Sequence, residues 1–463
     1  KQQTKKRLRL YNARPEDIVQ QTAFDRYLQS KGVMADTLIK LKMNEAINRE
    51  LLAEDSAFPK IPPKQYTYST EFQISEATTQ LGFDFLTASY QVYSGGNGPI
   101  YLNPSLTAIT KIGISDLMEN HRIIGGFGIG VDLTSTEFMV SYENLERRLS
   151  HQIVLHLANT TDYTDVYNAT RNQSYNAHYI LKYPLTPANL IRGSVFGRLD
   201  RIVYKGTSPI TLEKKDSYVL RLGLRGEWVY DHSRTIMPNI YNGTRAKAWI
   251  EYYQGVFGKK DNLFVVGFDA RYYHKIYRTF IWASRFATST SFGQSKLIYY
   301  MGGVDSWMMA KFNREMKVND KMQYAYQTLA TNMRGFAQNI RNGNTFAVIN
   351  TELRFPAFQV LSRTPVSSSF WRSFMIVAFV DVGSAWSGLN PFSKENTYYK
   401  KTIEDGPLTI ELERNTSPFV VGFGAGLRAQ LGGYSLRLDC AWGAADYMVS
   451  KNPSLYFSLA TDF

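Results

Sequence analysis

Residues 216–228 read DSYVLRLGLRGEW, and this stretch decides the class of fold. An extended chain alternates its side chains, so the stretch has an apolar face and a charged face. The first face holds Leu220, Leu222, Leu224 and Trp228, and the second holds Arg221, Gly223, Arg225 and Glu227. Charged side chains are costly inside a soluble β-sandwich, whereas the wet lumen of a wide barrel tolerates them. The stretch therefore predicts a strand in the wall of a membrane barrel.

The same period of two recurs along the rest of the chain. It is found at 84–92, 107–117, 121–132, 136–145, 150–158, 174–183, 190–199, 245–255, 262–273, 278–287, 345–355, 374–383, 418–429, 434–443 and 454–463. Counting gives about sixteen strands, with a margin of about two, and single-chain bacterial barrels have an even number. The pattern predicts an all-β fold, a transmembrane antiparallel β-barrel over residues 65–463. A soluble two-sheet protein is the competing fold, and it would keep its polar faces toward solvent only.

The expected connections differ in length. Short turns such as Glu119-Asn120 alternate with long polar stretches at 159–174, 304–343 and 387–417. Membrane barrels have this asymmetry, with short periplasmic turns and longer outer loops.

Residues 1–64 differ from the rest of the chain. They begin KQQTKKRLRL, and Pro15 followed by Glu16 and Asp17 suits the start of a helix. The stretch FPKIPPK at 58–64 then breaks regular structure. We expect a short helical N-terminal lead-in that faces water on the periplasmic side. A flexible tail with nascent helices is the alternative.

Composition excludes several classes of protein. The 463 residues include one cysteine, Cys440, which excludes an intramolecular disulfide and a cysteine zinc site. The sequence contains no run of about 18 apolar residues, so no transmembrane helix is predicted. A formal charge of +13 can indicate nucleic-acid binding. In a barrel, we expect these charges to line the lumen and to meet anionic outer-membrane lipids and lipopolysaccharide, with no nucleic acid bound.

Motifs of enzymatic chemistry are not found in the sequence. The six histidines form no H-E-x-x-H pattern, and no G-x-S-x-G elbow or phosphate loop is present. Gly422, Gly424 and Gly426 resemble a dinucleotide fingerprint, but they alternate along a strand and no helix follows. We therefore expect no metal, no cofactor and no enzymatic activity.

The most informative group of residues lies between 301 and 383. The stretch 304–343 is too long for an ordinary hairpin loop, and loops of this length are usually functional. On the predicted strands that follow, Glu352 and Asp381 have the phase of lumen-facing side chains. Two lumen carboxylates require a cation, and Arg334 in the long loop offers a planar fork of donors.

These residues resemble a specific family. The chain looks like the BamA-type superfamily of outer-membrane assembly and translocation barrels, also called the bacterial surface antigen family. In that family a V-R-G-F/Y motif in the sixth outer loop folds back into a sixteen-stranded barrel, where its arginine contacts an F-x-D-x-G strand. The residues that match here are Met333, Arg334, Gly335 and Phe336 in the loop, and Phe379, Asp381 and Gly383 on the strand.

The chain departs from the family pattern in three ways. Met333 stands where valine is usual. About 30 residues separate Gly302-Gly303 from Arg334. In familiar members of the family, the arginine motif follows such a glycine pair almost directly. The N-terminal stretch is too short for the family's POTRA modules. TYSTEFQIS and the residues after it resemble chains of Bacteroidota in which a TolB-like propeller precedes the barrel, which implies an upstream periplasmic domain.

The end of the chain carries one further signal. In PSLYFSLATDF, 453–463, Phe457, Leu459 and Phe463 share the apolar face of the last predicted strand. A terminal aromatic residue on such a strand resembles the signal by which outer-membrane barrels are recognised for assembly.

The resemblance implies outer-membrane protein biogenesis, by insertion or translocation of proteins at a seam between the first strand, near 84–92, and the last, 454–463. It also implies unfolded outer-membrane proteins as substrates and periplasmic or lipoprotein accessory subunits as partners. A passive or gated channel remains the alternative function. For Arg334, bracing of the loop against Asp381 and Glu352 and a direct part in moving substrate both remain open.

Overall fold

The computed structural model describes residues 44–45, 70–82, 90–93, 107–130, 133, 135–163, 168–206, 213–362, 366–405, 408–413 and 416–459. The chain divides into two compact units, residues 1–69 and 70–463. Of the lead-in expected over 1–64, only Asn44 and Glu45 are described, and both are helical. Among the described residues, no helix is long and apolar enough to cross a membrane.

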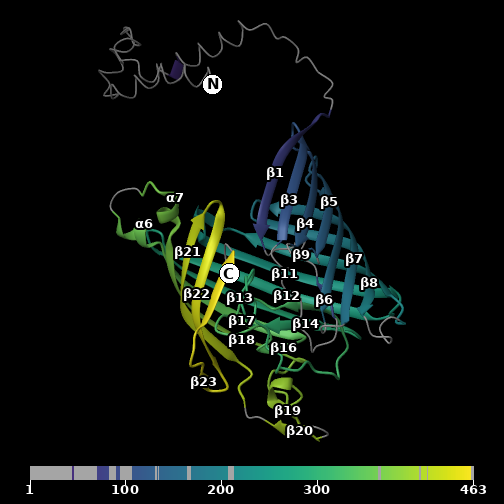
Figure 1. Ribbon diagram of the computed structural model, residues 1–463. Coiled ribbons are helices and arrows are strands. Elements are labelled where there is room, and N and C mark those ends of the chain that lie inside the picture. The colour runs from purple at the N-terminus through teal and green to yellow at the C-terminus, as the bar shows by residue number, and fades with distance from the viewer. Residues whose placement is uncertain are drawn as a thin grey trace, which may run out of the picture. The chain divides into compact units, whose positions relative to one another are not determined.

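The second unit is built on an 18-stranded sheet (Figure 1). Two of its strands, β10 (Arg234–Met237) and β23 (Met448–Val449), are short and pair with one end of β11 and of β22. The other sixteen form the antiparallel wall. They are β1 (Phe72–Gly82), β3 (Thr107–Asp116), β4 (His121–Gly130), β5 (Thr136–Asn144), β6 (Ser150–Tyr163), β7 (Asn168–Thr186), β8 (Asn189–Gly206), β9 (Ser217–Asp231), β11 (Ile240–Phe257), β12 (Asn262–Tyr277), β13 (Phe280–Phe292), β17 (Thr345–Phe355), β18 (Met375–Trp386), β21 (Val420–Leu431), β22 (Tyr434–Ala445) and β24 (Ser454–Leu459). The predicted all-β fold and transmembrane barrel are confirmed.

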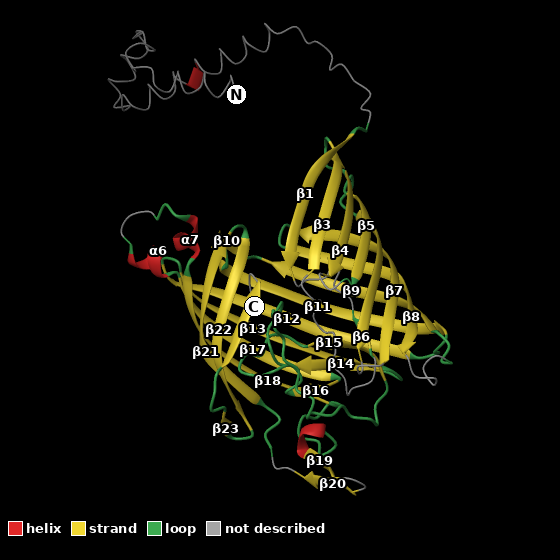
Figure 2. Ribbon diagram, in the orientation of Figure 1, coloured by secondary structure: helices red, strands yellow, loops and turns green. Residues whose placement is uncertain are grey.

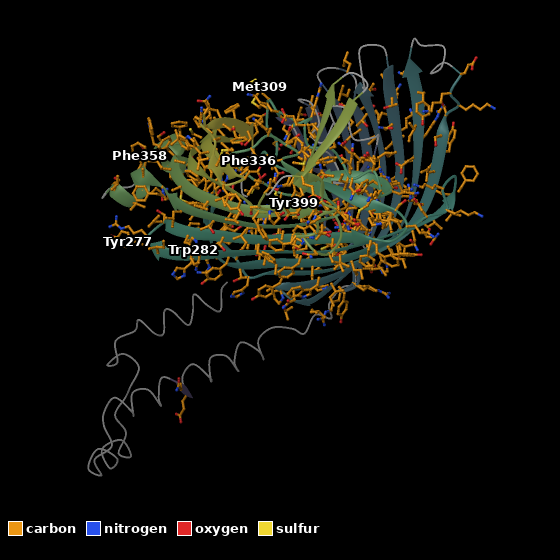
Figure 3. All side chains as sticks on the ribbon, turned by 90° about the horizontal axis from the view of Figure 1, so that it is seen from below. Tyr277, Trp282, Met309, Phe336, Phe358 and Tyr399 are labelled. Atoms are coloured by element: carbon orange, nitrogen blue, oxygen red, sulfur yellow. The ribbon has the colours of Figure 1, made fainter. Side chains whose placement is uncertain are left out.

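Side chains of the wall alternate as a membrane barrel requires. On β9, Leu222 and Leu224 are more than half exposed on the outer face. Arg221, which precedes them and points to the opposite face, is buried. Figure 3 shows the same arrangement around the wall, with Trp282 and Tyr277 directed outward and Phe336 lying inside. Apolar side chains thus face the lipid, and charged ones face the interior.

The interior holds a second, four-stranded sheet, in the order β16-β14-β15-β2. Its strands are β2 (Gln91–Val92), β14 (Lys296–Met301), β15 (Tyr324–Leu329) and β16 (Arg341–Gly343). Leu297 and Tyr326 of this sheet are completely buried, and they share a core with Phe196, Tyr253 and Phe346 from the inner face of the wall. The stretch expected as a loop at 304–343 therefore contains strands of its own, and the sheet packs inside the barrel.

The prediction that the wall begins with a strand at 84–92 is wrong for the part that the structure describes, whereas residues 84–89 lie outside the described residues. The first strand of the wall is β1, ten or so residues earlier, and Gln91–Val92 instead pair with β15 in the interior. β1 reads FQISEATTQLG, in which polar residues fall on both faces after Ile74, and its register shifts between Ile74 and Glu76. A strand without clear alternation gives no signal of period two.

The predicted loop at 159–174 is also wrong. β6 continues to Tyr163 and β7 begins at Asn168. Asn159 and Asn172 are buried on the inner face, and threonine and tyrosine between them favour extended structure. These strands are polar on both faces here, so a search for apolar alternation stops too early.

The remaining described elements lie at the two ends of the barrel (Figure 2). α6 (Ala357–Leu361) and α7 (Ser369–Ser373) connect β17 to β18 at one end. The short helix Thr397–Tyr399 and the hairpin of β19 (Lys400–Asp405) and β20 (Leu408–Glu413) connect β18 to β21 at the other.

The first and last strands of the wall each have one neighbour. Within the described residues, the register of β1 runs only with β3 and that of β24 only with β22. No ladder joins β1 to β24 in this part of the chain. In Figure 1, β1 and β22, which pairs with β24, lie on the two sides of this interruption.

Candidate functional site: the buried Arg334 cluster

Arg334 reaches the wall because the chain turns sharply beside it. Met333 and Gly303 form an isolated antiparallel bridge, which closes the stretch of chain between these two residues. Gly335 then adopts φ +94°, a conformation that other residues rarely take. A Cβ at Gly335 would lie 2.6 Å from the carbonyl oxygen of Trp442, so the turn also presses closely against β22. Glycine is required at this position on both counts.

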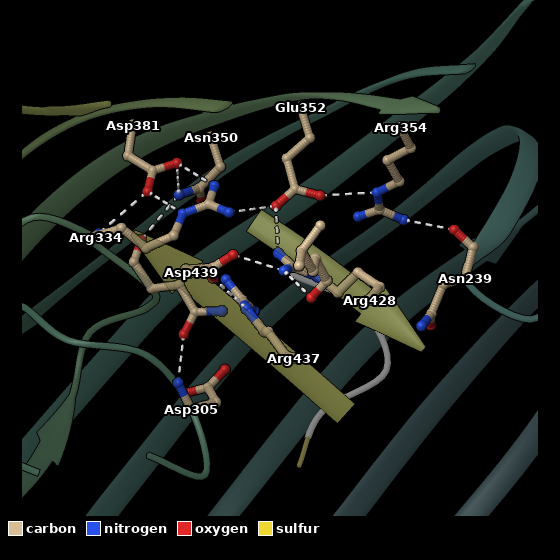
Figure 4. A network of polar contacts seen from close by, with 12 residues as sticks. Asn239, Asp305, Arg334, Asn350, Glu352, Arg354, Asp381, Arg428, Arg437 and Asp439 are labelled. Atoms are coloured by element: carbon tan, nitrogen blue, oxygen red, sulfur yellow. Dashed lines mark hydrogen bonds and ion pairs between the residues drawn. The ribbon is translucent and has the colours of Figure 1, made fainter. Parts of the chain in front are cut away.

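Four hydrogen bonds join Arg334 to the wall, three from its side chain and one from its backbone (Figure 4). Its Nε and Nη2 donate to Oδ2 and Oδ1 of Asp381, both at 2.6 Å, which is a bidentate pair. Its Nη1 donates to Oε1 of Glu352 at 2.5 Å. The backbone N–H of Arg334 also donates to Asp381 Oδ2. The structure thus brings together the loop arginine and both carboxylates from β17 and β18.

Aromatic and small residues complete the setting of Arg334. Its guanidinium lies 3.6 Å from the centre of the Phe379 ring, a cation–π contact. Met333 and Phe336 are buried in the core shared by the interior sheet and the wall. At Gly383 an added Cβ would lie 2.8 Å from Val348 on β17, so a glycine lets the two strands pack closely there.

The cluster extends beyond the residues expected from sequence. Asn350 donates to Asp381 Oδ1 at 2.9 Å and to the Asn332 carbonyl, so it links the wall to the loop as well. Arg354 donates to Glu352 Oε2 at 2.8 Å. These partners share one face of β17 with Glu352, and their alternation in the stretch 344–356 is the signal that can find them.

Other members come from β21 and β22 and have no such local signal. Asp439 accepts from Arg428 at 2.6 Å and from Arg437 at 2.7 Å. Arg428 also lies 3.8 Å from Glu352, which joins this group to the Arg334 contacts. Gly422 on β21 faces the turn, since a Cβ there would lie 1.8 Å from the carbonyl oxygen of Arg334. Only the register of the strands brings these residues to the cluster.

The electrostatics of the cluster favour a fully ionised state. Arg334, Asp381 and Asp439 are completely buried. Burial alone would lower the pKa of the Arg334 guanidinium, but the neighbouring carboxylates of Asp381 and Glu352 raise its pKa above the ordinary value. Each charge has a partner of opposite sign within hydrogen-bonding distance, which is the condition for burying charges at all. The arrangement can hold a loop in place, and it leaves Arg334 no open side for substrate.

The chain between β13 and β17, residues 293–344, is called the inserted segment below. A second anchor attaches this inserted segment to the other side of the barrel. Tyr326 of β15 donates its hydroxyl to Asp200 on β8 at 2.9 Å. The same oxygen accepts from Arg221 on β9 at 3.3 Å, and the Arg198 guanidinium lies 4.3 Å from the Tyr326 ring centre. The segment between β13 and β17 is therefore fixed to β8 and β9 by Tyr326 and to β17 and β18 by Arg334.

The residues of the last strand lie where the sequence predicts alternation. Phe457 is exposed on the outer face and Leu459 is partly exposed, whereas Tyr456 and Ser458, which alternate with them, are buried. Phe463 lies outside the described residues.

Comparison with known proteins places the chain in a family. The model of the Omp85 superfamily domain matches residues 70–463, which is the whole of the barrel unit. The chain belongs to the Omp85 superfamily. A comparison with curated protein sequences finds no match. The superfamily acts in protein insertion and translocation at the bacterial outer membrane, which is the membrane of this Omp85 barrel.

Solved structures resemble the Omp85 barrel at low identity. BamA from Haemophilus ducreyi, lacking POTRA domains 1–3, is 12% identical with a TM-score of 0.49, and the match covers 90% of this chain and 77% of that one. CdiB from Escherichia coli is 10% identical with a TM-score of 0.46, and the match covers 85% and 67%. CdiB from Acinetobacter baumannii is 12% identical with a TM-score of 0.41, covering 84% and 59%.

Proposed function

We propose that this Omp85 barrel is a non-enzymatic machine that inserts unfolded proteins into the outer membrane, or translocates them across it, at the seam between β1 and β24. The observation that carries the proposal is the pairing of the wall: among its described strands, β1 forms a ladder only with β3, and β24 only with β22. A strand edge that has no ladder with another wall strand can offer backbone N–H and C=O groups to an incoming strand.

The interior of the barrel supports a seam rather than a pore as the route. The sheet of β14, β15, β16 and β2 packs against the inner face of the wall in one core. A passive or gated channel needs an open lumen, so this filling disfavours the alternative function. In this proposal the ion pairs of Arg334 with Asp381 and Glu352 hold the inserted segment in place. The polar groups of the Arg334 side chain donate to these two carboxylates.

The partners follow from the same proposal. Unfolded outer-membrane proteins are the substrates, and periplasmic or lipoprotein accessory subunits deliver them. Lipopolysaccharide and outer-membrane lipids surround the exposed apolar face of the wall. In this proposal the N-terminal segment lies in the periplasm.

Reconstitution tests the function. The purified barrel is placed in phosphatidylethanolamine–phosphatidylglycerol vesicles, and a urea-unfolded outer-membrane barrel protein is added. Folding of the added protein is measured by its heat-modifiable migration on a gel. We expect this folding to be faster than in vesicles without the purified barrel. Ion conductance across a planar bilayer is measured in parallel. Steady conductance with no gain in folding rate would reject the proposed insertion function and favour the channel function.

A further inference from the structure

The outer edge of β24 is not free in this structure. β24 uses one edge for its register with β22, from Leu436 opposite Leu459 to Ala441 opposite Ser454. On its other edge, the carbonyl oxygen of Phe457 accepts a hydrogen bond from the N–H of Met308 at 3.0 Å. Trp307 and Ser458 form an isolated antiparallel bridge. Residues of the inserted segment therefore occupy the place of the next strand.

Side chains hold this segment to the last strand and to the loop motif. Trp307 is buried, and its ring centre lies 4.8 Å from that of Tyr456 on β24. The Tyr456 hydroxyl donates to the carbonyl oxygen of Phe336 at 2.9 Å. The turn that carries Arg334 and the segment on the edge of β24 thus share one buried tyrosine.

The contact has the features of a temporary occupant. It consists of one bridge rather than a ladder. Ser306, which precedes it, has φ +54°, a left-handed conformation that is unfavourable for a residue other than glycine. Met309, which follows it, is 77% exposed. A continuous strand bonded along the whole edge would make more contacts than this short piece does.

We infer that Ser306–Met308 is a built-in substitute strand, which caps the edge of β24 and must leave before a strand of a substrate protein can pair there. The inference rests on the proposed function, because it names the element that competes with substrate at the proposed seam. The partner of the uncapped edge is an extended chain with period-two alternation, since an edge recognises backbone groups and alternate side chains. Departure of Trp307 also releases Tyr456, so opening of the edge and the position of the Arg334 turn are coupled.

A reversible cross-link tests this inference. Because Met308 and Phe457 share the hydrogen bond, Trp307 and Ser458 face each other as a non-hydrogen-bonded pair, whose Cα atoms are typically about 4.5 Å apart. This spacing lies within the range of about 4.4–6.8 Å that a disulfide spans. The variant is Trp307→Cys/Ser458→Cys in a Cys440→Ala background, which removes the one native cysteine. Oxidation fixes the cap, and a reducing agent frees it in the same molecules.

A matched lock controls for stiffening of the segment itself. Phe312 and Gln338 form a parallel bridge within the inserted segment and do not belong to β24. In Phe312→Cys/Gln338→Cys, with Cys440→Ala, oxidation should leave activity unchanged. For the cap lock, we expect insertion of the unfolded barrel protein to be at least about tenfold slower oxidised than reduced, because the edge cannot pair with a new strand. Equal rates in the two states, with the disulfide formed, would overturn the inference.

A binding measurement separates this inference from the proposed function. The probe is a fluorescent peptide with the sequence of β1, FQISEATTQLG, added to the detergent-solubilised protein. We expect it to bind the reduced cap lock and the oxidised control lock, and not the oxidised cap lock. Binding to all three overturns the cap. Failure of the wild-type protein to accelerate insertion, together with the expected peptide result, would instead reject the proposed function and retain the cap.

Discussion

Arg334 is the residue on which the inserted segment depends most. Its side chain is buried and bonded to Asp381 and Glu352, and its removal leaves two carboxylates without their shared cation. Sequence alone predicts the inward phase of these carboxylates, because the alternation along β17 and β18 is regular. It does not predict Asp439 or Arg428, since nothing local encodes the register that brings β21 and β22 to the same place.

Arg334→Ala should destabilise the barrel by about 3–5 kcal/mol, the usual cost of breaking a buried ion pair by removing one partner. Arg334→Lys should recover only part of this, because lysine keeps the charge and loses the fork. The double variant with Asp381→Ala should be no worse than the worse single variant, because both remove the same contact. Thermal unfolding in detergent measures each effect.

Arg192→Ala is the matched control for that series. Arg192 lies 3.0 Å from Glu227, and its side chain is 35% exposed. Glu227 is buried, but it keeps Arg225 and Lys247 as partners when Arg192 is removed. Because Arg192 itself is partly solvated and Glu227 stays paired, we expect a loss of about 0–1 kcal/mol, as for a surface pair. Additive losses from Arg334→Ala and Asp381→Ala, or an equal loss from Arg192→Ala, would contradict the bracing role.

Gly335 tests the turn rather than the charge. Gly335→Ala should undock the Arg334 turn, because a Cβ would lie 2.6 Å from the carbonyl oxygen of Trp442 at a positive φ. Gly388→Ala is the control, since Gly388 has φ +85° but nothing within 4 Å of the added carbon. Limited proteolysis within 304–343 should increase strongly for Gly335→Ala and little for Gly388→Ala. Equal cleavage would mean that strain at positive φ, and not the close contact with β22, explains the effect.

At the scale of elements, the interior sheet is the feature that the sequence does not predict. Its strands β14, β15 and β16 are short and buried on all sides, so they lack the alternation by which the wall strands are recognised. β15 pairs in parallel with β14, which needs the long connection between them. β1 is missed for the opposite reason, because its polar residues fall on both faces.

Tyr326 should be an energetic anchor of the interior sheet. Tyr326→Phe removes the hydroxyl that donates to Asp200 and accepts from Arg221. Asp200 keeps Arg198 and Arg221 keeps Asp261, so the expected cost is that of the lost hydrogen bonds to charged groups, about 1–3 kcal/mol. Tyr300→Phe is the matched control: Tyr300 is equally buried on β14, and its hydroxyl has no partner among the described residues. We expect a loss of thermal stability for Tyr326→Phe and little or no loss for Tyr300→Phe. Indistinguishable melting temperatures would show that the sheet is not fixed to β8 and β9 through this group.

At the scale of the whole molecule, the wall of sixteen strands, its filled interior and its interrupted pairing act together. The inserted segment is fixed to β17 and β18 through Arg334, to β8 and β9 through Tyr326 and to β24 through Trp307. A movement of this segment therefore changes the interior and the edge of the last strand at the same time. In the proposed function the lumen stays filled while the wall opens between β1 and β24, which is a property that an insertion machine needs and a channel does not.

Photo-cross-linking in living cells tests the seam most directly. A photo-reactive phenylalanine analogue replaces Phe457 on β24, which is 38% exposed on the outer face, or Leu222 on β9, which is 51% exposed on the same kind of face of the opposite wall. The account predicts that newly made outer-membrane proteins cross-link at position 457 and not at position 222. Equal cross-linking at the two positions, or none at 457 while such proteins are being made, would contradict insertion at the seam.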